Sequence, residues 1–232
     1  MFDFMLKLMV TPLLFFGCAV AKNTIKPATP QKAFNPILFA DVPDMSMVRV
    51  DDTYYMSSTT MHMSPGVPIM KSTDLVNWQL VSYCYDTLAS TDELNLTNGK
   101  STYGRGSWAS SIRFHNGTFY VTTFAQPTGS THIYSTKNIE KGPWKAVSFR
   151  PSLHDHSLFF DQDGKVYMLY GNRKLTLVEL NADLSGLKES GVNQVVIENS
   201  TLPTEHIGNS GLGEGSQLFK VNGKYYLFNI TW

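Results

Sequence analysis

The stretch PSLHDHSLFFDQDGKVYMLYG, residues 151–171, decides the predicted fold. Leu158 and Phe160 are apolar residues two positions apart, a polar turn cluster follows at 162–164, and Val166, Met168 and Tyr170 continue with the same spacing. Two short alternating segments around a Gly-containing turn predict a β-hairpin. An acid, Asp155, stands just ahead of the first segment.

The same pattern occurs three more times along the chain. The further copies are MVRVDDTYYMSS (47–58), SIRFHNGTFYVTTF (111–124) and QLFKVNGKYYLF (217–228). Asp44 precedes the first of them and Glu214 the last, whereas the middle copy has Ala109 at the corresponding position. Three of the four repeats therefore place a carboxyl at the same point before their first predicted strand.

The spacing of the repeats predicts an all-β propeller. The Ser that follows each marked position recurs at 46, 111, 157 and 216, which are 65, 46 and 59 residues apart. A repeat of roughly 40 to 50 residues with inserted loops is typical of propeller blades. If each first strand lines a common axis, Asp44, Asp155 and Glu214 converge in one pocket. The fourth repeat has room for one hairpin, so we expect an incomplete ring of about three and a half blades.

The N-terminal region reads as an export signal. In residues 1–21, Lys7 precedes an apolar run that ends in a small-residue cleavage site. This pattern predicts a secreted or periplasmic protein. An alternative is a lipid anchor on the cell surface through Cys18, because residues 15–18 loosely resemble a bacterial lipidation box. A polar linker is expected over 22–34, and a partial propeller domain over 35–232.

Composition narrows the class of ligand. Lys plus Arg and Asp plus Glu both total 19, so nothing attracts nucleic acid or an anionic membrane. The N-terminal apolar run is too short for a transmembrane segment. Aromatic content of 12% with charged content of 16% fits a β protein that handles a neutral, hydroxyl-bearing ligand. After cleavage Cys84 is the only cysteine, which predicts a buried free thiol.

Four ordered motifs carry a family resemblance. They are FADVPDMSMVRVDDTYYMSSTTMHMSPGVPIMKSTDLVNW, GSWASSIRFHNGTFYV, HDHSLFFDQDGKVYMLYG and GEGSQLFKVNGKYYLF. Together they resemble glycoside hydrolase family 43, the five-bladed propeller enzymes that act on arabinose- and xylose-containing plant polysaccharides. The resemblance implies that Asp44 is the general base and Glu214 the general acid. It implies that Asp155 orients the general acid and modulates its pKa.

The resemblance also bears on cofactors. It implies no required cofactor, and a structural calcium in the complete family fold. The His near that calcium and a substrate-contacting Arg belong to a part of the family fold that is absent from this chain. His154 and His156 flank Asp155, but two His around one Asp are not a metal-ligand pattern, so we expect no metal there.

The expected chemistry is an inverting hydrolysis. One carboxylic acid protonates the leaving oxygen while a carboxylate on the opposite face activates water, which needs about 6.5–9.5 Å between them. Trp108 lies one residue before Ala109, so its ring either faces the axis and stacks on a sugar or packs in the core. His62 and Phe124 are further candidates for substrate binding, from the ends of inner strands.

Two functions remain open from the sequence. The first is a glycosidase that hydrolyses O-glycosyl bonds, a β-xylosidase or α-L-arabinofuranosidase. The alternative is a truncated, catalytically inactive carbohydrate-binding remnant of such an enzyme. A related retaining class uses an Asn-Asp-Pro-Asn motif, which does not occur in this sequence.

Overall fold

The structure is a computed structural model that describes residues 32–61, 64–202 and 213–231. Ala33–Trp232 form one compact unit. The predicted signal peptide with Cys18, and most of the predicted linker, lie outside the described residues. Within the described part of the chain, no helix is long and apolar enough to cross a membrane.

The first sheet has four antiparallel strands in chain order. They are β1 (Ser46–Val50), β2 (Thr53–Ser57), β3 (Gly66–Ser72) and β4 (Gln79–Tyr85). Val50 pairs with Thr53, which leaves a two-residue turn whose first residue, Asp51, has φ of 52°. Asp tolerates this left-handed conformation, so the hairpin forms at the predicted place.

The next two sheets repeat this order. The second contains β5 (Ser111–His115), β6 (Thr118–Ala125), β7 (Ser130–Thr136) and β8 (Lys145–Phe149). The third contains β9 (Ser157–Phe160), β10 (Val166–Tyr170), β11 (Leu175–Leu180) and β12 (Asn193–Ile197). A fourth sheet in the described residues is the hairpin of β13 (Gly213–Val221) and β14 (Lys224–Thr231).

The loops add two short helices that the sequence pattern does not predict. In the segment after β4, α1 (Asp92–Asn95) begins after Thr91, whose side chain accepts a hydrogen bond from the Leu94 N–H. A 3₁₀ turn, η1 (Gln126–Thr128), connects β6 to β7. One turn is too short to create a hydrophobic period, so only the capping residue marks α1 in the sequence.

The apolar core lies between neighbouring sheets rather than at one centre. One cluster joins Val67 and Ile69 of the first sheet to Ile112 and Val121 of the second. Two further clusters join the second sheet to the third and the third to the β13–β14 hairpin. Each sheet is therefore packed face to face against the next, as blades are.

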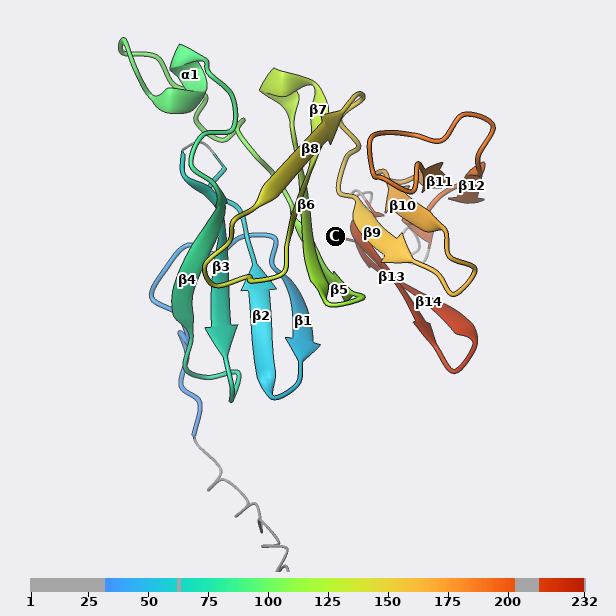
Figure 1. The fold of residues 1–232 in the computed structure, drawn as a ribbon, viewed down its shortest axis with the longest axis horizontal. Helices are drawn as coiled ribbons and strands as arrows, with labels where there is room; N and C mark the ends of the chain where they lie inside the picture. Colours follow the sequence, from blue (N-terminus) through green and yellow to red (C-terminus); the bar gives the residue numbers. More distant parts are fainter. Residues whose placement is uncertain (1–31, 62–63, 203–212, 232) are drawn as a thin grey trace, which may run out of the picture. The chain divides into compact units, whose positions relative to one another are not determined.

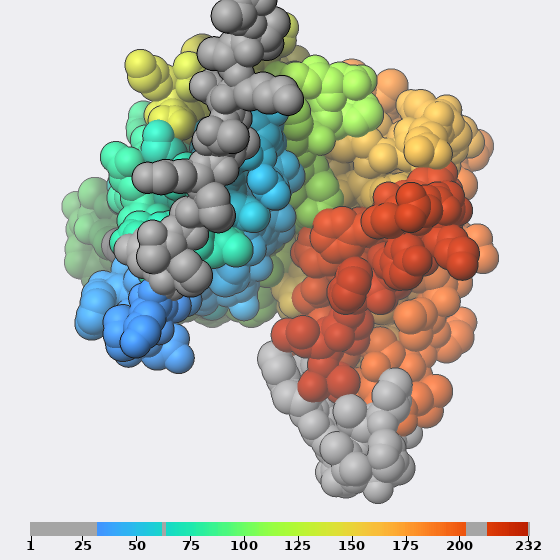
Figure 2. All heavy atoms as spheres, turned by 90° about the horizontal axis from the view of Figure 1, so that it is seen from below, coloured from blue at the N-terminus to red at the C-terminus, as the bar shows by residue number. Residues whose placement is uncertain are grey.

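The first strands of the four sheets are neighbours in space. β1 contacts β5, β5 contacts β9, and β9 contacts β13 (Figure 1). Figure 2 shows the atoms of successive sheets following one another in the order of the colour bar. This order is radial repetition around the first strands, so the predicted propeller architecture is confirmed, with three complete blades and the first hairpin of a fourth.

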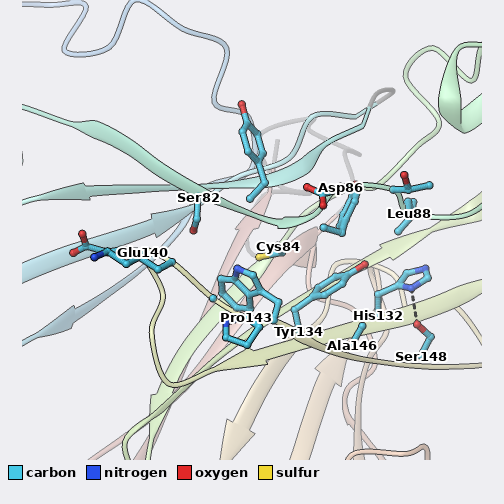
Figure 3. Close-up of a pocket in the computed structure, with 16 residues that line it drawn as sticks. Ser82, Cys84, Asp86, Leu88, His132, Tyr134, Glu140, Pro143, Ala146 and Ser148 are labelled. Atoms are coloured by element: carbon cyan, nitrogen blue, oxygen red, sulfur yellow. Dashed lines mark hydrogen bonds between the residues drawn. The ribbon is translucent and has the colours of Figure 1, made fainter.

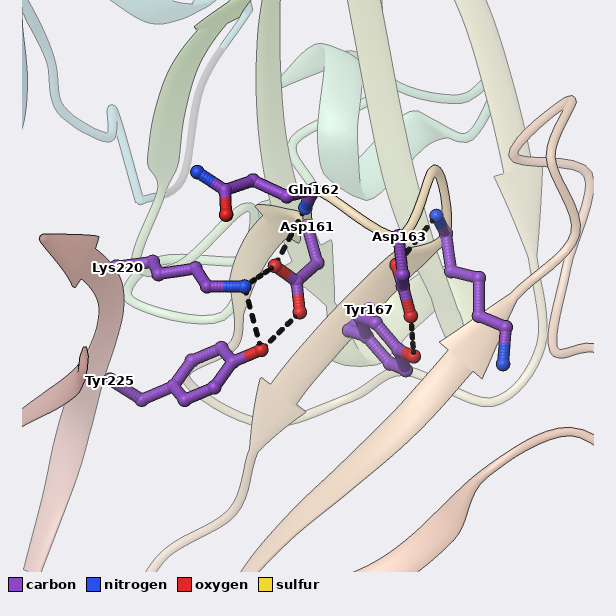
Figure 4. Close-up of polar contacts among 7 residues, drawn as sticks. Asp161, Gln162, Asp163, Tyr167, Lys220 and Tyr225 are labelled. Carbon is purple, nitrogen blue, oxygen red and sulfur yellow. Dashed lines mark hydrogen bonds and ion pairs between the residues drawn. The ribbon is translucent and has the colours of Figure 1, made fainter. Parts of the chain in front are cut away.

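A polar cluster joins blade three to blade four (Figure 4). Asp161, which follows β9, accepts a hydrogen bond from Lys220 Nζ at 2.6 Å on Oδ1 and from the Tyr225 hydroxyl at 2.5 Å on Oδ2. The side chains of Asp161 and Lys220 are only 8% and 18% exposed. The ion pair and the hydrogen bond from Tyr225 thus connect both strands of the β13–β14 hairpin to the residue that follows β9.

Candidate active site

The three phased acids all lie where an inner strand begins. Asp44 is two residues before the first residue of β1, Asp155 is two residues before the first residue of β9, and Glu214 is the second residue of β13. The Ser that follows each acid is buried in all three blades. Positions that are equivalent in the sequence repeat therefore lie near the starts of equivalent strands.

The backbone bends at each of these positions. Asp44 has φ of 51°, Asp155 has φ of 46°, and Gly215, next to Glu214, has φ of 67°. Positive φ in a residue with a side chain is uncommon and clusters at functional sites. The pairing of β13 with β14 also shifts register between Glu214 and Gln217. Such an irregularity re-aims a side chain relative to the ladder.

The carboxyl groups act on one another across the blades. Burial raises the pKa of Asp44, and the charge of Glu214 raises it further. Burial also raises the pKa of Asp155; His154 opposes that rise, and the charges of Glu214 and Asp44 add to it. The charge of Glu214 thus acts on both Asp44 and Asp155, which come from two other blades.

His154 completes the cluster, and the sequence analysis gave it no role in the site. Its Nε2 lies 2.9 Å from Glu214 Oε2 and 3.8 Å from Asp155 Oδ1. The side chains of Glu214 and Asp155 are 11% and 14% exposed, against 30% for His154. In the sequence, its position beside Asp155 was the sign of such a role. Its partner Glu214 could not be recognised, because it lies 60 residues further along the chain.

Two predicted aromatic residues lie beside His154. The Trp108 ring meets the His154 ring edge-on with centroids 6.2 Å apart, and Phe124 does so at 5.3 Å. Trp108 is half-buried, and its Nε1 donates a hydrogen bond to the Gly104 carbonyl at 3.0 Å. Phe124 is 1% exposed, so its ring lies behind Trp108 and His154 in the protein interior. His62 lies outside the described residues.

The same cluster contains residue types that can bind a metal ion. One ligand atom each from His154, Asp155 and Glu214 lie within 4.8 Å of one another. These residues offer one nitrogen and two carboxylates. Calcium takes six to eight oxygen ligands, so these three residues alone do not make a calcium site.

A separate cavity of about 540 Å³ opens between blades one and two (Figure 3). Its wall comes from β4 and the residues after it, and from β7 and β8 with the loop between them. His132 on this wall is held between Thr128 Oγ1 at 2.9 Å and Ser148 Oγ at 2.8 Å, and burial lowers the pKa of His132 to about 4. None of the three phased acids lines this cavity.

The arrangement suits hydrolysis by two carboxyl groups. Asp44 comes from the start of blade one, whereas Glu214 comes from blade four with His154 and Asp155 beside it. An acid and a base on different walls of one site are the requirement of an inverting glycosidase. Residues 33–229 match the model of Glycosyl hydrolases family 43.

The chain belongs to glycosyl hydrolases family 43. It is 32% identical over 204 residues to a β-xylosidase of Formosa agariphila, covering 85% of this chain and 34% of that protein. It is 30% identical over 208 residues to a non-reducing end α-L-arabinofuranosidase of Bacteroides ovatus, covering 86% of this chain and 36% of that protein. The chain thus spans about a third of the length of the curated relatives it matches.

Solved structures of the family share the fold. A bifunctional GH43-CE protein of Bacteroides eggerthii is 64% identical with a TM-score of 0.81, over 88% of this chain and 26% of that one. A xylan β-1,4-xylosidase of Bacillus halodurans is 29% identical with a TM-score of 0.67, over 86% of this chain and 39% of that one. The family assignment made from the four motifs is confirmed.

Proposed function

We propose that this chain carries the catalytic acids of an inverting glycoside hydrolase that releases arabinose or xylose from plant cell-wall polysaccharides or oligosaccharides. The observation that carries the proposal is that one imidazole meets two of the three acids. His154 Nε2 lies 2.9 Å from Glu214 Oε2 and 3.8 Å from Asp155 Oδ1, and the charge of Glu214 also raises the pKa of Asp44. Isolated acids at loop ends commonly cap turns. Three that share one site have a chemical role as a group.

Each acid has a distinct part in the proposed reaction. Asp44, as general base, takes a proton from water while that water attacks the anomeric carbon. Glu214, as general acid, gives its proton to the oxygen of the leaving group as the glycosidic bond breaks. Asp155 orients Glu214, because both carboxyls lie against the same imidazole, that of His154. No metal or other cofactor takes part in these steps.

A pentose is the favoured substrate unit. The related proteins of Formosa agariphila and Bacteroides ovatus are a β-xylosidase and an α-L-arabinofuranosidase. Trp108 offers the flat apolar face on which a sugar ring stacks, next to the acid cluster. Phe124 supports that ring from behind, and His62 stays a candidate for contacting the sugar hydroxyls.

The direct test is hydrolysis by the whole natural protein that contains this chain. Purified protein is incubated with aryl α-L-arabinofuranosides and aryl β-D-xylosides, then with arabinoxylan oligosaccharides, in the presence of a chelator. Release of a pentose that is lost in Asp44→Ala supports the proposal. Binding of the oligosaccharides without any hydrolysis favours the alternative, an inactive carbohydrate-binding remnant, and overturns the enzyme.

We also infer export, from residues 1–21. Secretion or delivery to the periplasm fits a substrate too large to enter a cell. Mass spectrometry of the natural protein is expected to show an N-terminus after Ala21. An N-terminal lipid on Cys18 would support the cell-surface alternative instead, and retention of Met1 would contradict export by cleavage.

A further inference from the structure

We propose that His154 is a positioning residue that holds Glu214 in place and returns a proton to it after each turnover. The inference rests on the proposed function, because it assigns a partner to the proposed general acid. Its first observation is the contact between His154 Nε2 and Glu214 Oε2 at 2.9 Å, which is hydrogen-bond distance.

The imidazole is held firmly enough to position the acid. Its ring meets the edges of two aromatic rings, at 6.2 Å for Trp108 and 5.3 Å for Phe124. The carbonyl of the same residue accepts a hydrogen bond from the Gly171 N–H at 2.9 Å. With backbone and ring both fixed, the hydrogen bond restricts the carboxyl of Glu214 rather than following it.

The ring also connects Glu214 with solvent. The Glu214 side chain is 11% exposed, whereas that of His154 is 30% exposed. In the described residues Nε2 is committed to Glu214, and no described partner bonds to the other ring nitrogen, Nδ1. One nitrogen thus meets the acid and the other is available to exchange protons with water, which is the arrangement of a proton shuttle.

The charged groups around His154 are carboxyls. Asp155 and Glu214 face it directly, and Asp44 of blade one acts on Asp155. His156, on the inner side, is fully buried with Nδ1 bonded to the Leu153 carbonyl, and burial lowers its pKa to about 4. His156 is therefore neutral near pH 7, and the nearest formal charges are negative.

The proton balance of the reaction requires such a route. In each turnover Glu214 loses one proton to the leaving oxygen, and Asp44 gains one from the attacking water. To restore the enzyme, Asp44 must release its proton to solvent and Glu214 must regain one. In the proposed step, Asp44 releases its proton to water, and the hydronium ion so formed protonates Nδ1 while Nε2 delivers its proton to Glu214 Oε2. Water, a neutral imidazole and a protonated acid result. Exchange with water then moves the ring proton from Nδ1 back to Nε2, which restores the imidazole for the next turnover.

The two functions of the ring can be separated by substitution. His154→Phe keeps a ring for Trp108 and Phe124 but removes both nitrogens. His154→Gln keeps a hydrogen-bonding group that does not titrate. His115→Gln is the control, because its ring stacks on Phe160 at 4.4 Å in blades two and three, outside the acid cluster.

Steady-state kinetics as a function of pH give the first test. For pentosides with poor leaving groups, we expect His154→Phe to lower kcat/KM by about 10- to 100-fold, the scale of one hydrogen bond to a charged group. The alkaline limb of the pH profile should move to lower pH, because the ring no longer returns a proton to Glu214. His154→Gln should recover part of the loss in rate but not the shift of the limb.

The second test does not need catalysis. In ¹⁵N NMR of the whole protein labelled at histidine, the ring resonances of His154 are expected to change their pH midpoint when Glu214→Gln is introduced. Kinetics of both His154 variants within about twofold of wild type, with an unmoved alkaline limb, would overturn the inference while leaving the glycosidase intact. An inactive wild type with the NMR coupling present would instead refute the proposed function and leave the His154–Glu214 pair standing.

Discussion

Asp44, at the start of blade one, lies close enough to Glu214 of blade four for the charge of Glu214 to raise the pKa of Asp44 beyond the effect of burial. The two residues are far apart in sequence, and only the radial order of the blades brings them together. The interaction connects the repeat pattern to the proposed chemistry, because it joins the proposed base to the proposed acid.

Replacing the base should stop hydrolysis of every substrate. Asp44→Ala removes the group that activates water, so kcat is expected to fall by at least about 10²- to 10⁴-fold for both activated and unactivated pentosides. Asp41→Ala, at an exposed residue just upstream, is the matched control and should leave the rate unchanged. Retained turnover in Asp44→Ala would exclude Asp44 as the base.

The loss of activity on replacing the acid should depend on the leaving group of the substrate. Glu214→Ala is expected to lower kcat/KM by about 10²- to 10⁴-fold for natural oligosaccharides, which need protonation of the leaving oxygen. Aryl pentosides with acidic phenols leave without that proton and should lose much less activity. A plot of log kcat against phenol acidity measures the difference. Equal losses on both substrate classes would argue against the acid role.

The coupling of the two acids predicts a pH effect with a definite sign. Asp44 must be ionised to act as base, and the charge of Glu214 is one of the two causes that raise its pKa. Glu214 carries that charge only when it is ionised, so Glu214→Gln should lower the pKa of Asp44 in the free protein. In ¹³C NMR of the aspartate carboxyls, the titration midpoint of Asp44 should therefore move to lower pH in this variant. A midpoint that stays in place or moves to higher pH would contradict the shared site.

The sequence predicts those parts of the fold that repeat. The turns at Asp51, Asn116, Gly164 and Asn222 were expected because alternation on both sides marks them, and the four hairpins form there. The three acids were predicted because each occupies the same position in its repeat. The pairing of His154 with Glu214 could not be predicted, because it depends on packing between blades and does not recur in the repeat.

The same limit applies to the contact between blades three and four. Asp161 stands beside a turn in the sequence, and nothing near it indicates Lys220 or Tyr225 as partners. The α1 helix is likewise fixed by one cap and a single buried residue, Leu94. Contacts of this kind depend on long-range geometry, which hydrophobic alternation does not encode.

Trp108 should contribute to substrate affinity. Trp108→Ala is expected to raise KM for pentosides about tenfold, the scale of one aromatic stacking contact, with a smaller change in kcat. Trp108→Phe keeps an aromatic face and should retain most of the affinity. Both variants lose the bond from Nε1 to Gly104, so comparing them separates stacking from structural support. Equal KM values in the two variants would favour core packing.

The Asp161 cluster should stabilise the fold in a pH-dependent way. Burial raises the pKa of Asp161, but bonds from Lys220, Tyr225 and the Gln162 N–H outweigh it and leave the pKa below its ordinary value of 3.8. A depressed pKa in the folded state gives stability that is present above pH 3.8 and is lost as pH falls further. Urea unfolding at pH 7 is therefore expected to show Asp161→Asn less stable than wild type.

The control for this prediction is Tyr225→Phe, which removes one hydrogen bond and keeps the ion pair. Its loss of stability should be smaller than that of Asp161→Asn at pH 7. The difference between Asp161→Asn and wild type should shrink below about pH 4, because the carboxyl of wild type is then becoming protonated. A constant difference across this range would show that the charge of Asp161 contributes nothing.

The stereochemistry of hydrolysis tests the central claim most directly. Proton NMR of the first product formed from an aryl pentoside by the whole protein reports the anomeric configuration before mutarotation. Direct attack by water, with Asp44 as base and Glu214 as acid, predicts a product of inverted configuration. A first product of retained configuration would require a covalent intermediate and would contradict the roles assigned to these acids.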